Sequence, residues 1–227
     1  MKTENNKITN SLSSGEGKGG NEQKPVSVLV IDNYDSFVYN LVHYLEELDC
    51  KVTVRRNNEL DLDEVENYDK ILLSPGPGIP DEAGLLKEII STYASKKSIF
   101  GVCLGQQAIG EVFGGKIINL QEVFHGVASK IKLSVIDEPL FEDMEAEMEV
   151  GRYHSWVVDK NLPACLEATS FDENGQVMSL RHRTYDVRGV QFHPESVLTP
   201  NGKKIIENWI KTPSVSKNAE KESASKI

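Results

Sequence analysis

Short apolar runs alternate with helix-like segments through the first half of the chain, and this alternation limits the folds available to it. Residues 26–31 and 98–102 are apolar enough for strands buried on both faces, and residues 51–55 and 70–73 indicate two further strands. Apolar residues at helical spacing fill the intervening segments. They predict a first helix, capped by Ser36, whose apolar face carries Leu41, Val42, Tyr44 and Leu45, and two further helices at residues 81–93 and 106–113. This order predicts a parallel sheet with helices on both faces.

The second half has a different pattern. Strand-like runs occupy residues 129–135, 165–170, 177–183 and 187–191, with turn residues between them, so we expect antiparallel pairs attached to the main sheet. A closing helix over residues 201–210 would pack Ile205, Ile206 and Trp209 against it. The predicted fold class is therefore a single α/β domain, with a mostly parallel central sheet covered by helices on both faces and a smaller antiparallel sheet.

Polar segments flank this domain. Residues 1–24 and 212–227 are too polar to compensate for the entropy of ordering, so we expect two disordered tails around a domain at residues 25–211.

The formal net charge of -10 argues against nucleic acid or anionic lipid as a partner. No segment reaches the roughly 20 apolar residues of a membrane span. With three widely spaced cysteines and no secretory signal, the chain is expected in the cytoplasm.

The segment from Gly101 to Gln107 is the most informative part of the sequence. Cys103 stands where a buried strand turns into a helix, with glycines at positions 101 and 105, and this is the pattern of a nucleophile elbow. Side chains at both glycine positions would collide with the neighbouring strand or helix. The helix N-terminus favours a thiolate, and the amide of Leu104 would point at a developing oxyanion. The alternative is a buried core cysteine beside two packing glycines.

Two further segments support a catalytic interpretation. His193 and Glu195 stand two residues apart at a predicted strand end, so both side chains leave the same face, as a base and the carboxylate that orients it would. A glycine loop follows the strand at residues 70–73, and Gly76 could bring a second amide to the oxyanion. Alone, these segments would indicate a solvated surface pair and a proline-rich turn.

Together the three segments closely resemble the class I, triad-type glutamine amidotransferases over residues 26–210. The resemblance implies a Cys-His-Glu triad of Cys103, His193 and Glu195, which hydrolyses glutamine through a γ-glutamyl thioester and passes ammonia to a synthase. The backbone amides of Gly76 and Leu104 would form the oxyanion hole. Residues implied to contact glutamine are Gly76, Pro77, Gly78, Gln107, Ser155 and Trp156. No metal site is expected.

Within that family, residues 32–37, 124–126 and 151–156 resemble component II of anthranilate synthase or of aminodeoxychorismate synthase. The resemblance implies a chorismate-binding component I as partner, in a heterodimer or heterotetramer that serves tryptophan or folate biosynthesis. No cofactor is expected in this subunit, and Mg²⁺ is expected on the partner. The chain departs from the family in two places, with Gln106 where histidine is frequent and Val127-Ala128 where Lys-Thr is frequent.

Other functions remain open from the sequence. The chain could be the glutaminase of another synthase, such as a guanylate or carbamoyl-phosphate system, or a stand-alone peptidase that cleaves γ-glutamyl bonds. In a third alternative it would be a non-catalytic regulatory module of the same fold, although Cys103, His193 and Glu195 are all present. The choice between anthranilate and aminodeoxychorismate depends on the partner, and we expect anthranilate.

Overall fold

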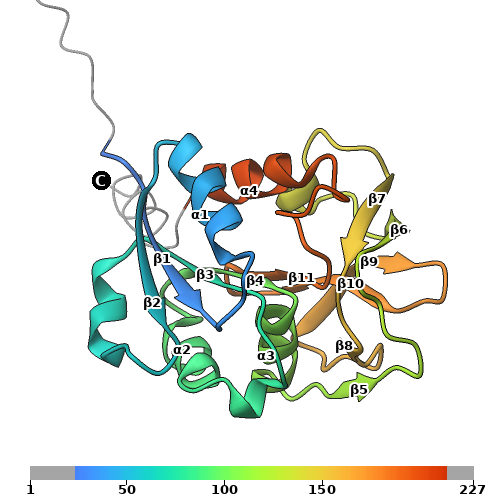
Figure 1. Cartoon of the computed structure of the whole chain (residues 1–227), viewed down its shortest axis with the longest axis horizontal. Helices are drawn as coiled ribbons and strands as arrows, with labels where there is room; N and C mark the ends of the chain where they lie inside the picture. The colour runs from blue at the N-terminus through green and yellow to red at the C-terminus, as the bar shows by residue number, and fades with distance from the viewer. Residues whose placement is uncertain (1–23, 214–227) are drawn as a thin grey trace, which may run out of the picture.

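A computed structural model describes residues 24–213 of the 227-residue chain, so the predicted polar tails lie outside the described residues except at their innermost positions. These residues form one α/β unit built on a nine-stranded sheet, in the order β2-β1-β3-β4-β11-β10-β9-β6-β7. The predicted fold class is confirmed. Its antiparallel part, however, continues the main sheet, and a two-stranded sheet of β5 and β8 lies beside it (Figure 1).

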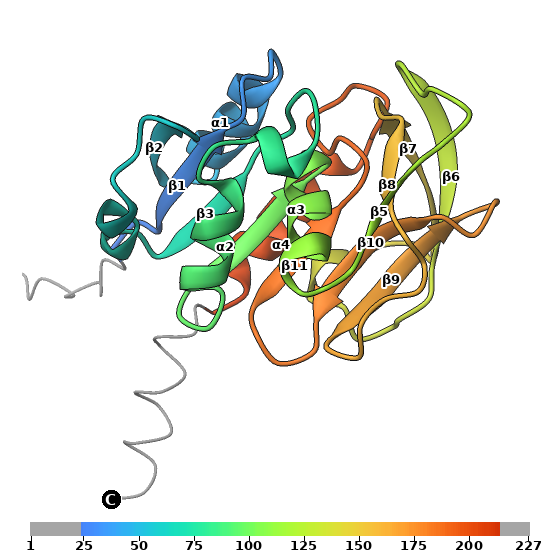
Figure 2. The ribbon, with the colours of Figure 1, turned by 90° about the horizontal axis from the view of Figure 1, so that it is seen from below.

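The parallel half of the sheet carries the predicted helices on both faces. Its strands are β1 (Ser27–Asp32), β2 (Lys51–Arg56), β3 (Lys70–Leu73), β4 (Ser98–Val102) and β11 (Val187–Val190). Helices α1 (Val38–Glu47) and α4 (Gly202–Lys211) cover one face, and α2 (Leu86–Tyr93) and α3 (Leu104–Val112) cover the other (Figure 1, Figure 2).

The inner strands β1, β3 and β4 of the parallel half are largely apolar because each of their faces belongs to a different core. Val28 and Val30 of β1 pack with α1 and α4, whereas Leu29 and Ile31 pack with α2 and α3, and all four are fully buried. Each fully buried aliphatic side chain contributes about 1.5–3 kcal/mol of transfer free energy. The two cores hold the sheet rigid between the helix layers.

The antiparallel half follows β11 across the sheet. Its strands are β6 (Val127–Leu133), β7 (Glu147–Arg152), β9 (Leu166–Asp172) and β10 (Val177–His182), while β5 (Ile117–Asn119) and β8 (Trp156–Val158) form the small separate sheet. In Figure 2 these strands lie on the side of the molecule away from β1 and β2. Three short 3₁₀ helices complete the fold: η1 (Leu62–Asn67), η2 (Pro80–Glu82) and η3 (Pro139–Phe141).

Two local predictions are wrong. Ser36 does not cap α1; the carboxylate of Asp35 accepts the amide of Phe37 at 2.7 Å instead. The helix predicted at residues 81–93 is interrupted by Gly84, whose φ of +54° places it in the left-handed region. A Cβ at this glycine would lie 2.8 Å from the carbonyl oxygen of Asn57, so the close approach of the two segments requires glycine here.

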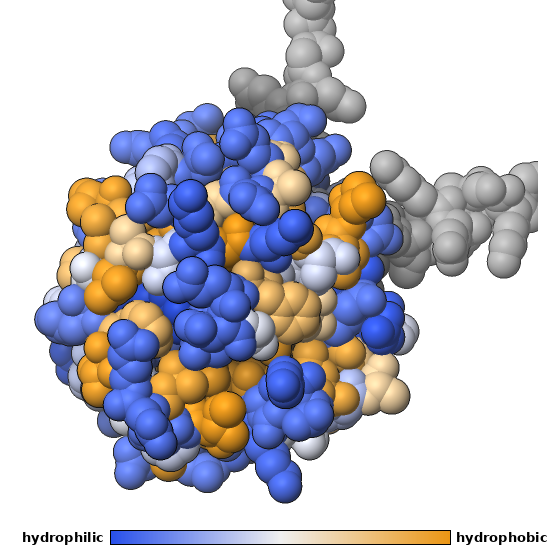
Figure 3. Space-filling view, turned by 90° about the vertical axis from the view of Figure 1, so that its right-hand side faces the viewer, coloured by the Kyte–Doolittle hydropathy of each residue, from blue (hydrophilic) through white to orange (hydrophobic). Residues whose placement is uncertain are grey.

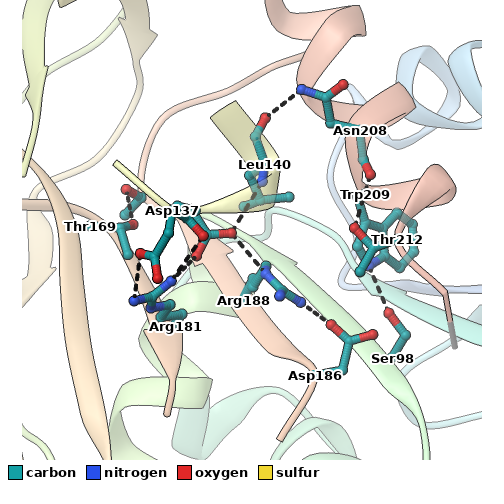
Figure 4. A network of polar contacts seen from close by, with 12 residues as sticks. Ser98, Asp137, Leu140, Thr169, Arg181, Asp186, Arg188, Asn208, Trp209 and Thr212 are labelled. Carbon is teal, nitrogen blue, oxygen red and sulfur yellow. Dashed lines mark hydrogen bonds and ion pairs between the residues drawn. The ribbon is translucent and has the colours of Figure 1, made fainter. Parts of the chain in front are cut away.

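At the amino ends of the parallel strands a polar network joins η3, β10, β11 and α4 (Figure 4). The buried carboxylate of Glu138 accepts the Leu140 amide at 3.1 Å and Nε of Arg188 at 2.8 Å. Nearby, Nε1 of Trp209 donates to Oγ of Ser98 at 3.1 Å. This network closes the end of the sheet opposite to the carboxyl ends of β3, β4 and β11.

Candidate active site

Cys103 is the single residue between the end of β4 and the start of α3, and its backbone has φ 51° and ψ -100°. This conformation is costly for a residue with a side chain, by about 1–3 kcal/mol. The turn is possible because its flanks are glycines. A Cβ on Gly101 would lie 2.5 Å from the carbonyl carbon of Gly105, and one on Gly105 would lie 2.6 Å from the Leu73 oxygen. The predicted strained elbow, with its sterically required glycines, is confirmed.

His193 and Glu195 lie in the loop that follows β11, and they are paired as predicted. Nδ1 of His193 is 2.7 Å from Oε1 of Glu195, and both residues are buried. The amide of His193 donates to the carbonyl of Gly151 at the end of β7, at 3.0 Å, and its own carbonyl accepts the hydroxyl of Thr199 at 2.6 Å. The histidine is therefore held by its backbone as well as by its carboxylate partner.

The imidazole of His193 is poised to hold a proton. Burial lowers the pKa of His193, but the neighbouring Cys103 thiol and the Glu195 carboxylate outweigh it, so that this pKa lies well above its ordinary value. Nε2 is buried, and apart from the Cys103 thiol no group among residues 24–213 offers it a hydrogen bond. The ring thus directs Nε2 to the sulfur of Cys103, on the side away from Glu195.

The glycine loop after β3 is fixed by Asn33. Nδ2 of Asn33 donates to the carbonyl of Ser74 at 2.8 Å, and a Cβ on Gly76 would lie 2.6 Å from Cβ of Asn33. Only glycine permits this approach. Leu104 is the first residue of α3, so its amide has no acceptor within the helix. The two backbone segments predicted to supply an oxyanion hole flank Cys103.

Two adjoining cavities open on Cys103. The first has a volume of about 160 Å³, below the range of drug-sized pockets, which suits a molecule of amino-acid size. It is lined by Gly76, Pro77, Gly78, Cys103, Gln107, Tyr153, His154, Ser155 and Trp156. All six residues predicted to contact the substrate thus line one cavity with the predicted nucleophile. The second, of about 390 Å³, brings His125 and His193 to the other side of Cys103.

The structure adds residues that the sequence analysis did not select. Tyr153 lines both cavities, and its ring centroid is 4.9 Å from that of His193. The buried guanidinium of Arg152 donates to Nε2 of His154 at 3.1 Å and to Asp172 at 2.8 Å. The sequence signal for Tyr153 was its place in the segment 151–156, beside two predicted substrate contacts. Within residues 24–213 no cluster of three or more His, Cys, Asp or Glu side chains could hold a metal ion.

These features define an α/β protein with a buried Cys-His-Glu constellation at the carboxyl ends of its parallel strands. The family of class-I glutamine amidotransferases matches residues 29–212. The chain belongs to this family.

Proteins with curated names give the finer comparison. The chain is 44% identical over 188 residues to the aminodeoxychorismate/anthranilate synthase component 2 of Bacillus subtilis, covering 82% of this chain and 96% of that protein. It is 46% identical over 188 residues to the bifunctional protein TrpGD of Thermotoga maritima, and here it spans 81% of its own length but only 32% of the relative.

Among solved structures, a Thermoplasma acidophilum protein assigned to GMP synthase has a TM-score of 0.76, with 24% identity over 90% of this chain and 100% of that one. This likeness concerns the fold alone.

None of the helices among the described residues has the length and apolar character that crossing a membrane requires.

Proposed function

We propose that the chain is the glutaminase subunit of a chorismate-using synthase, most directly of anthranilate synthase. The observation that carries the proposal is the placement of Cys103, on a strained turn between β4 and α3, in one cavity with all six predicted substrate contacts and beside a proton-holding His193. A buried thiol next to an imidazolium and a helix N-terminus is the environment of a nucleophilic thiolate.

The geometry supports a two-step hydrolysis. The Cys103 thiolate attacks the γ-carboxamide carbon of glutamine, and the amides of Gly76 and Leu104 stabilise the oxyanion. His193 gives its proton to the departing nitrogen, so ammonia leaves and a γ-glutamyl thioester remains on the sulfur. The same imidazole then removes a proton from water, which attacks the thioester and releases glutamate with the free thiolate. Glu195 keeps the ring oriented throughout, from its position 2.7 Å from Nδ1.

The relatives support the assignment of the partner. The Bacillus subtilis relative is named for both aminodeoxychorismate and anthranilate synthesis, and the chain covers nearly all of it. We therefore place this chain beside a chorismate-binding component I, which would carry Mg²⁺ and use the ammonia, in a heterodimer or heterotetramer. The expected product is anthranilate, for tryptophan biosynthesis. With the folate-pathway synthase as partner, the product would be aminodeoxychorismate. The three free cysteines fit a reducing cytoplasm.

The test is a reconstitution with each candidate component I, supplied with chorismate and either glutamine or ammonium salt. We expect glutamine to support product formation, and Cys103→Ser to abolish the glutamine-dependent rate while the ammonium-dependent rate is kept. Cys50→Ser is the matched control, because this half-buried thiol lies outside both cavities and its replacement should leave both rates unchanged.

Two results would contradict the proposal. Glutamine-dependent product from the Cys103→Ser complex would exclude the assigned nucleophile. Glutamine hydrolysis by the chain, without association with either synthase component, would instead indicate a stand-alone γ-glutamyl hydrolase.

A further inference from the structure

Gln191 lies directly beside the sulfur of Cys103, and neither the triad nor the substrate cavity accounts for it. Strands β4 and β11 are parallel neighbours in which Val102 faces Val190, so the residues that follow, Cys103 and Gln191, leave the sheet side by side. The amide of Cys103 donates to the carbonyl of Val190 at 2.8 Å. The side chain of Gln191 is fully buried, and its Nε2 lies 3.5 Å from Sγ of Cys103.

The orientation of this side-chain amide follows from its neighbours. The backbone carbonyl of Trp156 can only accept a hydrogen bond, so Gln107 must present its NH₂ group to it, at 2.9 Å. The second hydrogen of that NH₂ points to Oε1 of Gln191, at 3.3 Å. With its oxygen engaged in this way, Gln191 must direct its own NH₂ at the sulfur. Three hydrogen bonds thus connect the Trp156 carbonyl to Cys103: Gln107 donates to both of its neighbours, and Gln191 donates to the sulfur.

We propose that Gln191 donates a hydrogen bond to the thiolate of Cys103 and so stabilises and orients the nucleophile from the side of β11. The inference rests on the proposed glutaminase function, because the relevant charge is that of the reactive sulfur. A sulfur anion in a buried site needs more than one partner, since burial disfavours the charged form. The imidazole of His193 supplies one partner and the neutral amide of Gln191 supplies another, which cannot take the proton away.

The same hydrogen bonds connect the nucleophile to the substrate cavity. Gln107 and Trp156 line the cavity in which glutamine would bind, and these hydrogen bonds join both of them to Gln191. The sulfur is therefore oriented by the same side chains that shape the pocket. Gln191 acts on the reacting atom and is absent from the cavity lining, so its loss should affect turnover more than glutamine affinity.

Alkylation of Cys103 by iodoacetamide over a range of pH tests the proposal, in a Cys50→Ser, Cys165→Ser background. Gln191→Met keeps the length of the side chain and removes the donor. A hydrogen bond to a charged group corresponds to roughly a tenfold effect, so we expect the midpoint of the pH profile about one unit higher and the alkylation rate below that midpoint about tenfold lower. In glutamine hydrolysis kcat should fall by a similar factor, with KM within about twofold.

Gln106→Met is the matched control. Gln106 is also fully buried, but its amide atoms make no hydrogen bond to any group among residues 24–213, so its replacement should leave the alkylation profile unchanged. Should Gln191→Met fail to fold, Gln191→Glu preserves the shape and places a carboxylate against the sulfur. That variant should move the midpoint upward by more than one unit.

Coincident profiles for the wild-type protein and for whichever Gln191 variant folds would overturn the inference. The triad is judged separately, by His193→Gln. A profile changed by His193→Gln and unaffected at position 191 removes the role of Gln191 alone, whereas a profile unaffected by either substitution removes the proposed triad as well.

Discussion

Two buried histidines lie close to Cys103 with pKa values shifted in opposite directions, and their neighbours explain the difference. His193 faces a carboxylate and a thiol, which outweigh the effect of burial and raise its pKa. Burial, Arg152 and His193 itself lower the pKa of His154 to about 3. His154 is therefore neutral, with Nε2 accepting the hydrogen bond from Nε of Arg152. Of these two histidines, only His193 therefore favours the protonated form, and it is the one that gives a proton to the departing nitrogen in the proposed reaction.

His154 should make the protein sensitive to acid. Its pKa is lower in the folded state than the value of about 6.5 in the unfolded chain, so the unfolded state binds the extra proton first and stability falls as pH drops from about 6.5 towards 3. Between pH 7 and pH 5 this loss amounts to about 2 kcal/mol. In His154→Gln, whose amide oxygen can still accept from Arg152, that part of the loss should be absent.

Urea unfolding of both proteins at pH 7 and pH 5 measures the difference. An equal loss of unfolding free energy in wild type and His154→Gln would show that this histidine is not held neutral by the fold.

The principal site residues could be predicted from sequence because each has a local signal: Cys103 between glycines, and His193 two residues before Glu195. Gln191 and Arg152 could not. Their importance depends on contacts with residues far along the chain, such as the contact of Gln191 with Cys103 and that of Arg152 with Asp172. No spacing within a single segment carries that information.

At the scale of elements, the loops at one end of the sheet carry the site, and the network at the other end ties η3 to the strands (Figure 4). Glu138 is the centre of this network, with its side chain almost fully buried between Arg188 and the amide of Leu140. Its neighbour Asp137 pairs with Arg181 at 3.1 Å from a largely exposed position, at 80% side-chain accessibility. Adjacent carboxylates therefore offer a comparison of buried and exposed ion pairs.

Glu138→Ala should lower the free energy of unfolding by roughly 2–4 kcal/mol, because it removes the buried carboxylate that pairs with Arg188 and Arg181 and leaves η3 without its cap. Asp137→Ala should cost less than about 1 kcal/mol, as exposed pairs do. Chemical denaturation of the two variants decides the matter. Equal destabilisation would mean that burial of the Glu138 pair contributes nothing.

Most elements were predictable because their apolar pattern was sufficient: β3 and β4 have the predicted bounds. The helix at residues 81–93 was wrong because Gly84 interrupts it to meet Asn57, which is distant in sequence. Strand β7 was not predicted, since its alternation of Met148 and Val150 with exposed glutamates follows directly after an acidic run. The placement of β6, β7 and β9 as an extension of the main sheet depends on pairings across long loops.

At the scale of the whole molecule, apolar residues lie among polar ones on the face formed by the antiparallel half (Figure 3). His125 lines the second cavity, and Val123 and Val127, two residues before and after it in the sequence, are 70% and 41% exposed. Tyr34 and Phe37, which line the same cavity, are also exposed, and exposed apolar side chains beside a reactive centre suit the docking of a protein partner. The partner would then cover this cavity.

Val123→Asp should weaken association with the synthase component at least tenfold, because a charge would be buried at the interface, and should leave the free subunit folded. Ile136→Asp is the control, since Ile136 is fully exposed beyond the other end of β6. Affinity measured by calorimetry or surface plasmon resonance distinguishes them. Unchanged binding by Val123→Asp, or an equal loss in both variants, would place the interface elsewhere.

In the proposed reaction Sγ of Cys103 is the atom that attacks glutamine. The most direct measurement is mass-spectrometric mapping of the protein after treatment with a chloroketone analogue of glutamine, in the presence and absence of glutamine. We expect a single adduct on Cys103, prevented by glutamine and strongly slowed in His193→Gln. Labelling of Cys50 or Cys165 at the same rate, or labelling of Cys103 that glutamine does not prevent, would contradict it.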